Sequence, residues 1–196
     1  AWHPHKAKMQ NQMRLVVLDR DGTLNLDDKA IIAGPDDWTP IAGAFEAVAR
    51  LNQAGWRVVI ATNQSGLGRG LFDADTMNRV HAKMNKLMAT VGARVDAVFF
   101  CPHTRDDDCD CRKPKPGLIL KIAERFGVPV SDIAVAGNTV RHIQAGHAAG
   151  ARGHLLLTGK CAAYSADNPP PGLPHAAKVH ASLDAFVDHV LASANA

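Results

Sequence analysis

The chain has 196 residues, of which 46% are hydrophobic and 21% are charged, and its formal net charge is +3. This composition is typical of a soluble globular protein, and the length allows one domain with a sizeable core but not two ordinary domains. Disordered chains are poorer in apolar residues, nucleic-acid binders usually show a basic stripe, and a membrane span needs an apolar run of ~18 residues. The sequence shows none of these patterns, so we expect neither a nucleic-acid nor a membrane partner.

The two ends of the chain differ in composition from the part between them. Residues 1–12 are polar and basic and lack the apolar block of a signal peptide. We expect a flexible tail there, one domain over residues 13–192 and a short tail over residues 193–196. We also expect a monomeric cytoplasmic protein with reduced thiols.

Short apolar runs alternate along the chain with longer stretches of helical spacing. Most of the runs are rich in β-branched residues and do not alternate with polar ones, which is typical of strands buried on both faces. They predict strands at Leu15–Leu18, Val58–Ala61, Val95–Phe100, Ile133–Ala136 and His154–Leu157. The longer stretches predict helices at Ala44–Ala54, Asp73–Val91, Gly117–Phe126, Val140–Ala149 and Ser182–Ala192. The alternation predicts an α/β fold with a parallel central sheet and helices on both faces, while the prolines of Asn168–Pro174 predict an irregular loop.

Ligands of such sheets bind beyond the carboxyl ends of the strands, and the loop after the first predicted strand carries the clearest pattern. It reads Asp19-Arg20-Asp21-Gly22-Thr23. Two carboxylates this close need a cation between them, or one must stay protonated. The pattern indicates a Mg²⁺-assisted pair with one nucleophile and one acid/base. The alternative is a D-G turn that merely leaves a strand, but a buried strand followed by D-x-D-G-T is far more specific.

The sequence resembles the haloacid dehalogenase superfamily of phosphotransferases, whose first motif is D-x-D-G-T. The resemblance extends from about Met13 to Leu191 and implies a Rossmann-like three-layer sandwich with a minimal cap and a zinc-bound loop. It implies that Asp19 attacks phosphorus to form an aspartyl-phosphate, and that Asp21 protonates the leaving oxygen and then activates water. It also implies that Mg²⁺ is held by Asp19, Asp21 and Asn138.

The loop after the second predicted strand begins at Thr62 and contains three glycines up to Gly70. Its hydroxyl, amide and N–H groups are suited to holding phosphate oxygens, although a flexible polar loop is the plainer alternative. Thr62 matches the second phosphate-holding position of the superfamily. The continuation T-N-Q-S-G with G-R-G resembles the heptose bisphosphate phosphatases, whereas the related histidinol-phosphate phosphatases share only T-N-Q. The resemblance implies substrate contacts from Arg20, Asn63, Gln64, Ser65, Arg69 and Arg112.

Three of the four cysteines and one histidine lie close together in the sequence, as Cys101, His103, Cys109 and Cys111. Three cysteines with one histidine are a common structural zinc set that leaves no open position for catalysis. Free thiols and redox chemistry are weaker alternatives, and a reducing compartment disfavours disulfides. We therefore expect a structural zinc ion, which would order an acidic segment that has no apolar anchor.

The zinc-binding pattern runs directly into the basic pair Arg112-Lys113. The superfamily requires a lysine that neutralises the nucleophile and the phosphoryl group, and the resemblance assigns this role to Lys113. Arg112 would then contact the substrate. The alternative is a solvated basic pair that balances the charge of the thiolates.

The loop after the fourth predicted strand departs from the superfamily. The pattern G-D-x-x-x-D is replaced by Gly137-Asn138 and, at the second acidic position, His142. Asn138 offers one carbonyl oxygen but no charge, and His142 would oppose the cation if it were protonated. We therefore expect weak binding of Mg²⁺ and weak turnover.

The resemblance implies a Mg²⁺-dependent phosphatase that removes the C7 phosphate of D-glycero-D-manno-heptose 1,7-bisphosphate, on the way to activated heptose for bacterial surface polysaccharide. Two alternatives stay open: a histidinol-phosphate phosphatase, and a catalytically weakened relative that binds a phosphosugar or a protein partner. The remaining groups carry little signal. We expect surface positions for His147, His175, His180 and His189, and an ordinary thiol at Cys161.

Overall fold

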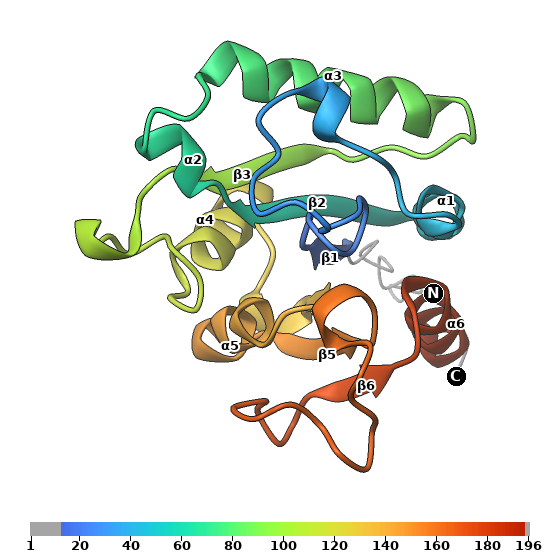
Figure 1. The fold of residues 1–196 in the computed structure, drawn as a ribbon. Helices are drawn as coiled ribbons and strands as arrows, with labels where there is room; N and C mark the ends of the chain where they lie inside the picture. The colour runs from blue at the N-terminus through green and yellow to red at the C-terminus, as the bar shows by residue number, and fades with distance from the viewer. Residues whose placement is uncertain (1–12, 195–196) are drawn as a thin grey trace, which may run out of the picture.

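The computed structural model describes residues 13–194, and these form a six-stranded parallel sheet with helices on both faces (Figure 1). The strands are β1 Arg14–Leu18, β2 Trp56–Asn63, β3 Ala97–Cys101, β4 Ile133–Gly137, β5 Arg152–Leu156 and β6 Lys178–His180. The helices are α1 Ala44–Gln53, α2 Ser65–Gly68, α3 Ala74–Ala89, α4 Gly117–Phe126, α5 Val140–Ala149 and α6 Leu183–Ala194. Short 3₁₀ turns lie at Pro35–Asp37, Arg105–Asp107, Val130–Asp132 and Gly159–Cys161. The predicted α/β fold is confirmed.

The strand order is β3-β2-β1-β4-β5-β6, so the chain moves outward from β1 in one direction and then from β4 in the other. The order therefore reverses between β1 and β4, which is where parallel sheets place their ligand sites. In the register, Leu18 of β1 lies beside Ile60 of β2 and Ala136 of β4. The loops after these strands consequently start close together.

Alternate residues of β1 enter two separate cores, because successive side chains of a strand point to opposite faces. Val16 and Leu18 pack with α1, α3 and α6, while Leu15 and Val17 pack with α4 and α5. Figure 1 shows α1 and α6 on one side of the sheet and α4 and α5 on the other. Because the strand is apolar on both faces, the run Leu15–Leu18 could be recognised without any alternation.

The predicted helices are present with small shifts, and Asp73 caps α3 by accepting a hydrogen bond from the Thr76 N–H. The strand predicted at Val95–Phe100 begins two residues later, at Ala97. The prediction of five strands was wrong, because β6 is a sixth. It is a three-residue edge strand whose only apolar residue is Val179, so it gave no apolar run. Asn168–Pro174 forms an irregular loop as predicted.

The structure describes the carboxyl-terminal boundary of the predicted domain but not the predicted tail that precedes it. The flexible tail expected at residues 1–12 lies outside the described residues, as do residues 195 and 196. Helix α6 continues to Ala194, two residues past the predicted end of the domain. Along residues 13–194, no helix has both the length and the apolar character needed to cross a membrane.

Two of the four histidines expected at the surface lie in a cluster instead. His147 and His175 are exposed, but His180 and His189 are half-buried next to buried His154. His154 Nδ1 and His180 Nε2 are 2.9 Å apart, and the rings of His180 and His189 have centroids 5.1 Å apart. These side chains join β5, β6 and α6, a contact that sequence spacing does not reveal.

Candidate active site and metal centre

Asp19 follows β1 directly and is only 7% exposed. Its Oδ1 accepts hydrogen bonds from Lys113 Nζ at 3.0 Å and from the Arg20 backbone N–H at 2.9 Å, and its Oδ2 accepts from Thr139 Oγ1 at 3.3 Å. Burial opposes ionisation, but Lys113, the neighbouring His142 and the Arg20 backbone N–H together outweigh it and lower the pKa of Asp19. The carboxylate is therefore ionised at neutral pH, as an attacking group must be.

Lys113 is buried and its ammonium has three acceptors, which matches its three N–H donors. Besides Asp19, Nζ donates to the Ala61 carbonyl oxygen at 2.8 Å and to His142 Nδ1 at 3.1 Å. The structure thus brings the predicted nucleophile and the predicted lysine into direct contact across 94 residues of sequence.

His142 does not carry the positive charge considered for it from the sequence. It is fully buried, and burial together with Lys113 lowers its pKa to about 4. Its Nε2 lies 3.2 Å from the Val17 carbonyl oxygen, so Nε2 carries the proton and Nδ1 is free to accept from Lys113. A neutral imidazole therefore orients the lysine where the superfamily has an acid.

Asp21 is partly exposed, and its Oδ1 accepts from Arg20 Nε at 2.9 Å and from Asn25 Nδ2 at 3.1 Å. Arg20 itself is 1% exposed and its Nη1 donates to His81 Nε2 at 3.1 Å. Burial and the neighbouring guanidinium lower the pKa of His81 to about 4, so this ring is a neutral acceptor. Arg20, predicted as a substrate contact, is buried here and orients Asp21 from inside the protein. Sequence reasoning missed both Asn25 and His81, which no recognisable pattern marks.

The predicted phosphate loop starts at Thr62, the side chain of which is buried at the end of β2 and accepts from Gln64 Nε2 at 3.0 Å. Ser65 begins α2 and is half-buried, while Arg69 is exposed after it. Asn63 binds the backbone of Lys113 on both sides, since Oδ1 accepts from its N–H at 3.1 Å and Nδ2 donates to its carbonyl at 3.2 Å. Asn63, predicted as a substrate contact, therefore also holds the lysine in place.

Asn138 directly follows β4 and is completely buried. Its Oδ1 accepts from Thr23 Oγ1 at 3.4 Å, and its Nδ2 donates to Asp27 Oδ2 at 3.4 Å. A side chain at Gly22 would collide with it, because a Cβ there would lie 2.0 Å from Asn138 Nδ2. Asp27 lies in an acidic loop and gave no signal in the sequence.

The donor atoms at this end of the sheet fit magnesium. Mg²⁺ prefers hard oxygen ligands, and the Asp19 carboxylate and the Asn138 amide oxygen meet that preference. Asp21, from the same loop as Asp19, adds a further carboxylate. These three residues would hold the ion, with less negative charge than a site that has three carboxylates.

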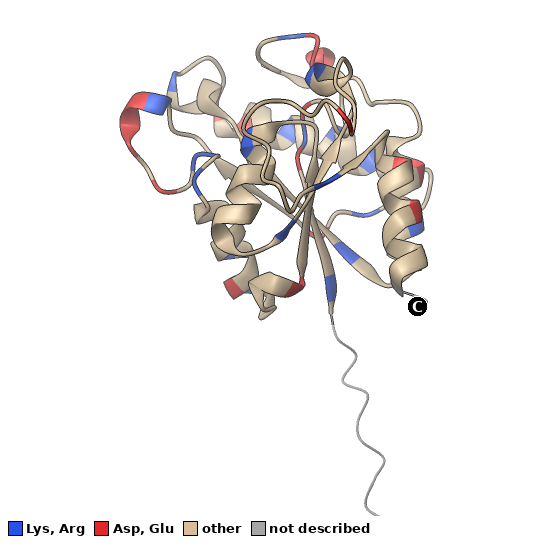
Figure 2. Cartoon of the chain, turned by 90° about the horizontal axis from the view of Figure 1, so that it is seen from below, with Lys and Arg blue, Asp and Glu red and all other residues tan. Residues whose placement is uncertain are grey.

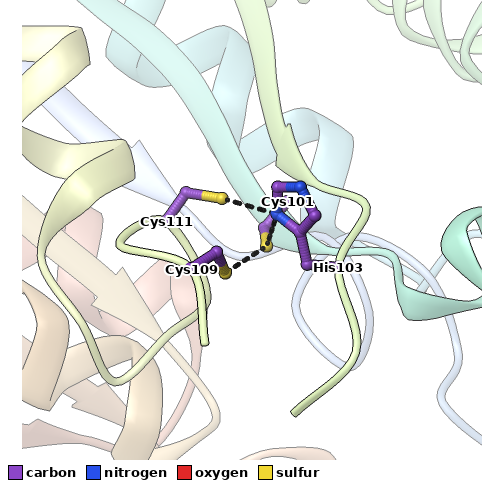
Figure 3. Close-up of side chains that lie close together, drawn as sticks. All are labelled: Cys101, His103, Cys109 and Cys111. Carbon is purple, nitrogen blue, oxygen red and sulfur yellow. Dashed lines mark hydrogen bonds between the residues drawn. The ribbon is translucent and has the colours of Figure 1, made fainter. Parts of the chain in front are cut away.

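The four predicted zinc ligands converge in space (Figure 3). Cys101 at the end of β3 meets His103, Cys109 and Cys111 from the following loop, and their four ligand atoms all lie within 4.8 Å of one another. Cys101 Sγ is 3.6 Å from Cys109 Sγ, and His103 Nδ1 is 3.3 Å from Cys111 Sγ. A tetrahedral zinc site with metal–sulfur bonds of ~2.3 Å separates its sulfurs by ~3.8 Å, so the cluster fits this ion.

A pocket of about 260 Å³ lies between the zinc-ligand loop and α5. Four cations besides Lys113 line it: Arg105, Arg112, Lys115 and Arg141. Arg112 is half-buried and its Nη1 donates to the His103 carbonyl oxygen at 3.3 Å, so the metal loop fixes its position. Lys113 also lines this pocket, which connects it to the predicted nucleophile. A further pocket of about 540 Å³, near Arg14 and Arg152 at the amino ends of the strands, is remote from this chemistry.

The model of the haloacid dehalogenase-like hydrolases matches residues 25–150, so the chain belongs to this family. Its similarity to individual members is more specific. It is 44% identical over 182 residues to the D-glycero-beta-D-manno-heptose-1,7-bisphosphate 7-phosphatase of Bordetella bronchiseptica, covering 93% of this chain and 100% of the relative. It is 45% identical over 148 residues to the protein of the same name from Neisseria meningitidis serogroup A, covering 76% of this chain and 79% of the relative.

Solved structures agree with these relatives. The D,D-heptose 1,7-bisphosphate phosphatase from B. bronchiseptica, complexed with magnesium and phosphate, has a TM-score of 0.86 at 44% identity, with 92% of this chain and 99% of that chain covered. The corresponding phosphatase from Burkholderia thailandensis has a TM-score of 0.70 at 46% identity, with 91% and 98% covered. The predicted family is confirmed.

Proposed function

We propose that this protein is a Mg²⁺-dependent phosphatase that removes the C7 phosphate of D-glycero-D-manno-heptose 1,7-bisphosphate during the synthesis of activated heptose. The observation that carries the proposal is the ionised Asp19 fixed by Lys113 at the carboxyl end of β1, in a chain whose 44% identical relative bears that activity in its name. Three reduced thiols at the zinc site favour a cytoplasmic location.

The reaction follows from the roles of two aspartates. Asp19 attacks the C7 phosphorus, a phosphorus–oxygen bond forms to its carboxylate, and the bond to the sugar oxygen breaks as Asp21 gives that oxygen a proton. Asp21 then takes a proton from water, which attacks the aspartyl-phosphate and releases inorganic phosphate. Lys113 offsets the negative charge that accumulates on the phosphoryl oxygens. Mg²⁺, when bound, supplies further electrostatic stabilisation of that charge.

The substrate assignment uses the basic pocket beside Lys113. A bisphosphate carries a second phosphate that is not cleaved, and arginine is suited to binding phosphate through two parallel hydrogen bonds. Arg112 and Arg141 line the pocket, and exposed Arg69 follows the short helix after β2. A substrate with one phosphate, such as histidinol phosphate, would leave this group of cations without a partner.

The test is phosphate release with Mg²⁺ from the heptose bisphosphate and, separately, from histidinol phosphate. We expect release of one phosphate from the bisphosphate, with the sugar 1-phosphate as product, and much slower release from histidinol phosphate. Faster hydrolysis of histidinol phosphate would overturn the substrate assignment. The names of the two relatives specify the beta anomer. Assays on both anomers of the bisphosphate would show which one this protein uses.

A weakened relative that binds phosphosugars remains the second candidate, because Asn138 and His142 replace two acids of the family pattern. Asn138 lowers the negative charge near Asp19, so we propose that a high Mg²⁺ concentration is needed for half-maximal rate. Changing both Asn138→Asp and His142→Asp should lower that concentration. Saturation of the unmodified protein at micromolar Mg²⁺ would refute the weakened reading.

A further inference from the structure

Asp27 lies in the loop after β1, and its carboxylate contacts the side chain at the position where the family pattern has an acid. Asn138 Nδ2 donates to Asp27 Oδ2 at 3.4 Å, while Thr23 Oγ1 donates to Asn138 Oδ1 at 3.4 Å. The amide is completely buried and the carboxylate is half-buried. A negative charge therefore lies one hydrogen bond away from the neutral Asn138.

Two glycines from different loops approach the Asn138–Asp27 pair. A Cβ at Gly22 would lie 2.0 Å from Asn138 Nδ2 and 2.8 Å from Asp27 Oδ2, and a Cβ at Gly159 would lie 2.6 Å and 2.8 Å from the same atoms. Both glycines have positive φ, 81° and 52°, which other residues rarely adopt. Gly22 directly follows Asp21, so the pair is next to the backbone of the catalytic loop and no side chain separates them.

Asp27 forms no ion pair with a cation of residues 13–194, whereas Asp19 is paired with Lys113 and Asp21 with Arg20. The neighbouring thiol of Cys161 adds no positive charge, and burial together with Asp27 raises the pKa of Cys161. An unpaired, half-buried carboxylate beside the residues that fit Mg²⁺ is suited to attract a divalent cation.

We propose that Asp27 supplies the negative charge at the divalent-cation site that Asn138 lacks. Asp27 then adds its negative charge to that of Asp19 and Asp21, and the neutral Asn138 hydrogen-bonds Asp27. This inference rests on the proposed function, because it assumes that the cation binds at Asp19. It assigns Asp27 to cation binding, without a role in bond making or breaking.

The test compares Asp27→Asn with Asp28→Asn by measuring the affinity for Mn²⁺, an oxygen-preferring stand-in for Mg²⁺, through electron paramagnetic resonance of the free ion. The zinc site is loaded first, so that its thiolates do not take up the probe. Asp27→Asn keeps an oxygen acceptor for Asn138 and removes only the charge. Asp28→Asn removes the same charge from the adjacent, exposed position of the same loop and is the matched control. We expect a loss of affinity of about tenfold for Asp27→Asn and less than about twofold for Asp28→Asn.

A second pair of variants separates this inference from the proposed function. Asp19→Asn should also weaken Mn²⁺ binding, and Asn138→Asp added to Asp27→Asn should restore it, because the charge returns at the neighbouring position. Equal affinities for the Asp27 and Asp28 variants, with binding still dependent on Asp19, would overturn the role of Asp27 alone. Binding that depends on neither Asp19 nor Asp27 would overturn both the role of Asp27 and the cation site of the proposed function.

Discussion

Lys113 shows how single residues determine the chemistry of this site. Its ammonium contacts a carboxylate, a backbone carbonyl and an imidazole nitrogen, and its backbone is held by Asn63. The three acceptors therefore hold the Lys113 ammonium in place and aim it at Asp19.

Asp19→Asn should abolish turnover while the fold survives. An amide cannot act as the nucleophile, yet it has the same shape as the carboxylate and can still accept a hydrogen bond from Lys113. Phosphate release measures the loss, and circular dichroism checks the fold. Turnover retained in a pure sample of this variant would rule out the aspartyl-phosphate mechanism.

Asn63→Ala should lower kcat by about tenfold, with a smaller change in KM, because it frees the backbone on both sides of Lys113 and lets the ammonium move away from Asp19. Asn63→Asp keeps the acceptor for the Lys113 N–H and should lose less. The kinetics of the two variants give the comparison. A change confined to KM would show that Asn63 acts only on the substrate.

At the scale of elements, the zinc-ligand loop connects β3 to α4 and carries Arg112 and Lys113 into the site. Three of its four ligands come after β3 ends. The loop packs closely against the start of α4, because a Cβ at Gly117, the first residue of α4, would lie only 2.3 Å from the Asp110 carbonyl oxygen. The loop has few apolar contacts of its own, so a metal ion provides the order that packing supplies elsewhere.

Cys109→Ser should remove most of the zinc and lower activity, because the loop then no longer holds Arg112 and Lys113. The sheet should remain folded, since Cys109 is only half-buried at the edge of its core. Metal analysis should give about one zinc per chain for the unmodified protein and much less for the variant. Full zinc content with lost activity would contradict this explanation.

At the scale of the whole molecule, three histidines outside the direct contacts of Asp19 lie where the charged form is disfavoured: His81, His154 and His180. Burial is the main cause at each: it lowers the pKa of His81 to about 4 with help from Arg20, and that of His180 to about 4 with help from His189 and Lys178. His154 has its pKa lowered to about 3 by burial and by the surrounding His180, His189, Arg152 and Lys178. All three are neutral in the folded protein at pH 7.

The protein should consequently lose stability as the pH falls below about 6.5, where the unfolded chain binds protons that the folded chain excludes. The loss continues down to the lowered pKa values, so this contribution is complete only above about pH 6.5. His154→Leu should reduce the fall in melting temperature between about pH 7.5 and about pH 5, while exposed His175→Leu should not. Equal pH dependence in both variants would show that buried His154 does not contribute.

Much of the fold and the zinc set could be predicted because the signals are local. A strand apolar on both faces, such as Leu15–Leu18, identifies itself as central, and the spacing of Cys101 to Cys111 already places four ligands on one short loop. The edge strand β6 escaped detection because its register with β5 depends on pairing rather than on its own three residues. The D-x-D-G-T motif at Asp19 is likewise local, so it predicts phosphatase chemistry without any tertiary contact.

Only the tertiary structure decided how these residues act on one another. Lys113 and Asp19 are far apart in sequence, as are His142 and Val17, and the folded sheet brings each pair within hydrogen-bond distance. Whether His142 is charged, whether Arg20 faces substrate and whether an acid lies beside Asn138 depend on burial and on partners from other strands. Residue identity and spacing therefore determined the family and its reaction. Desolvation and long-range contacts decided the charge of each group, because the electrostatics of a buried site depend on everything packed around it.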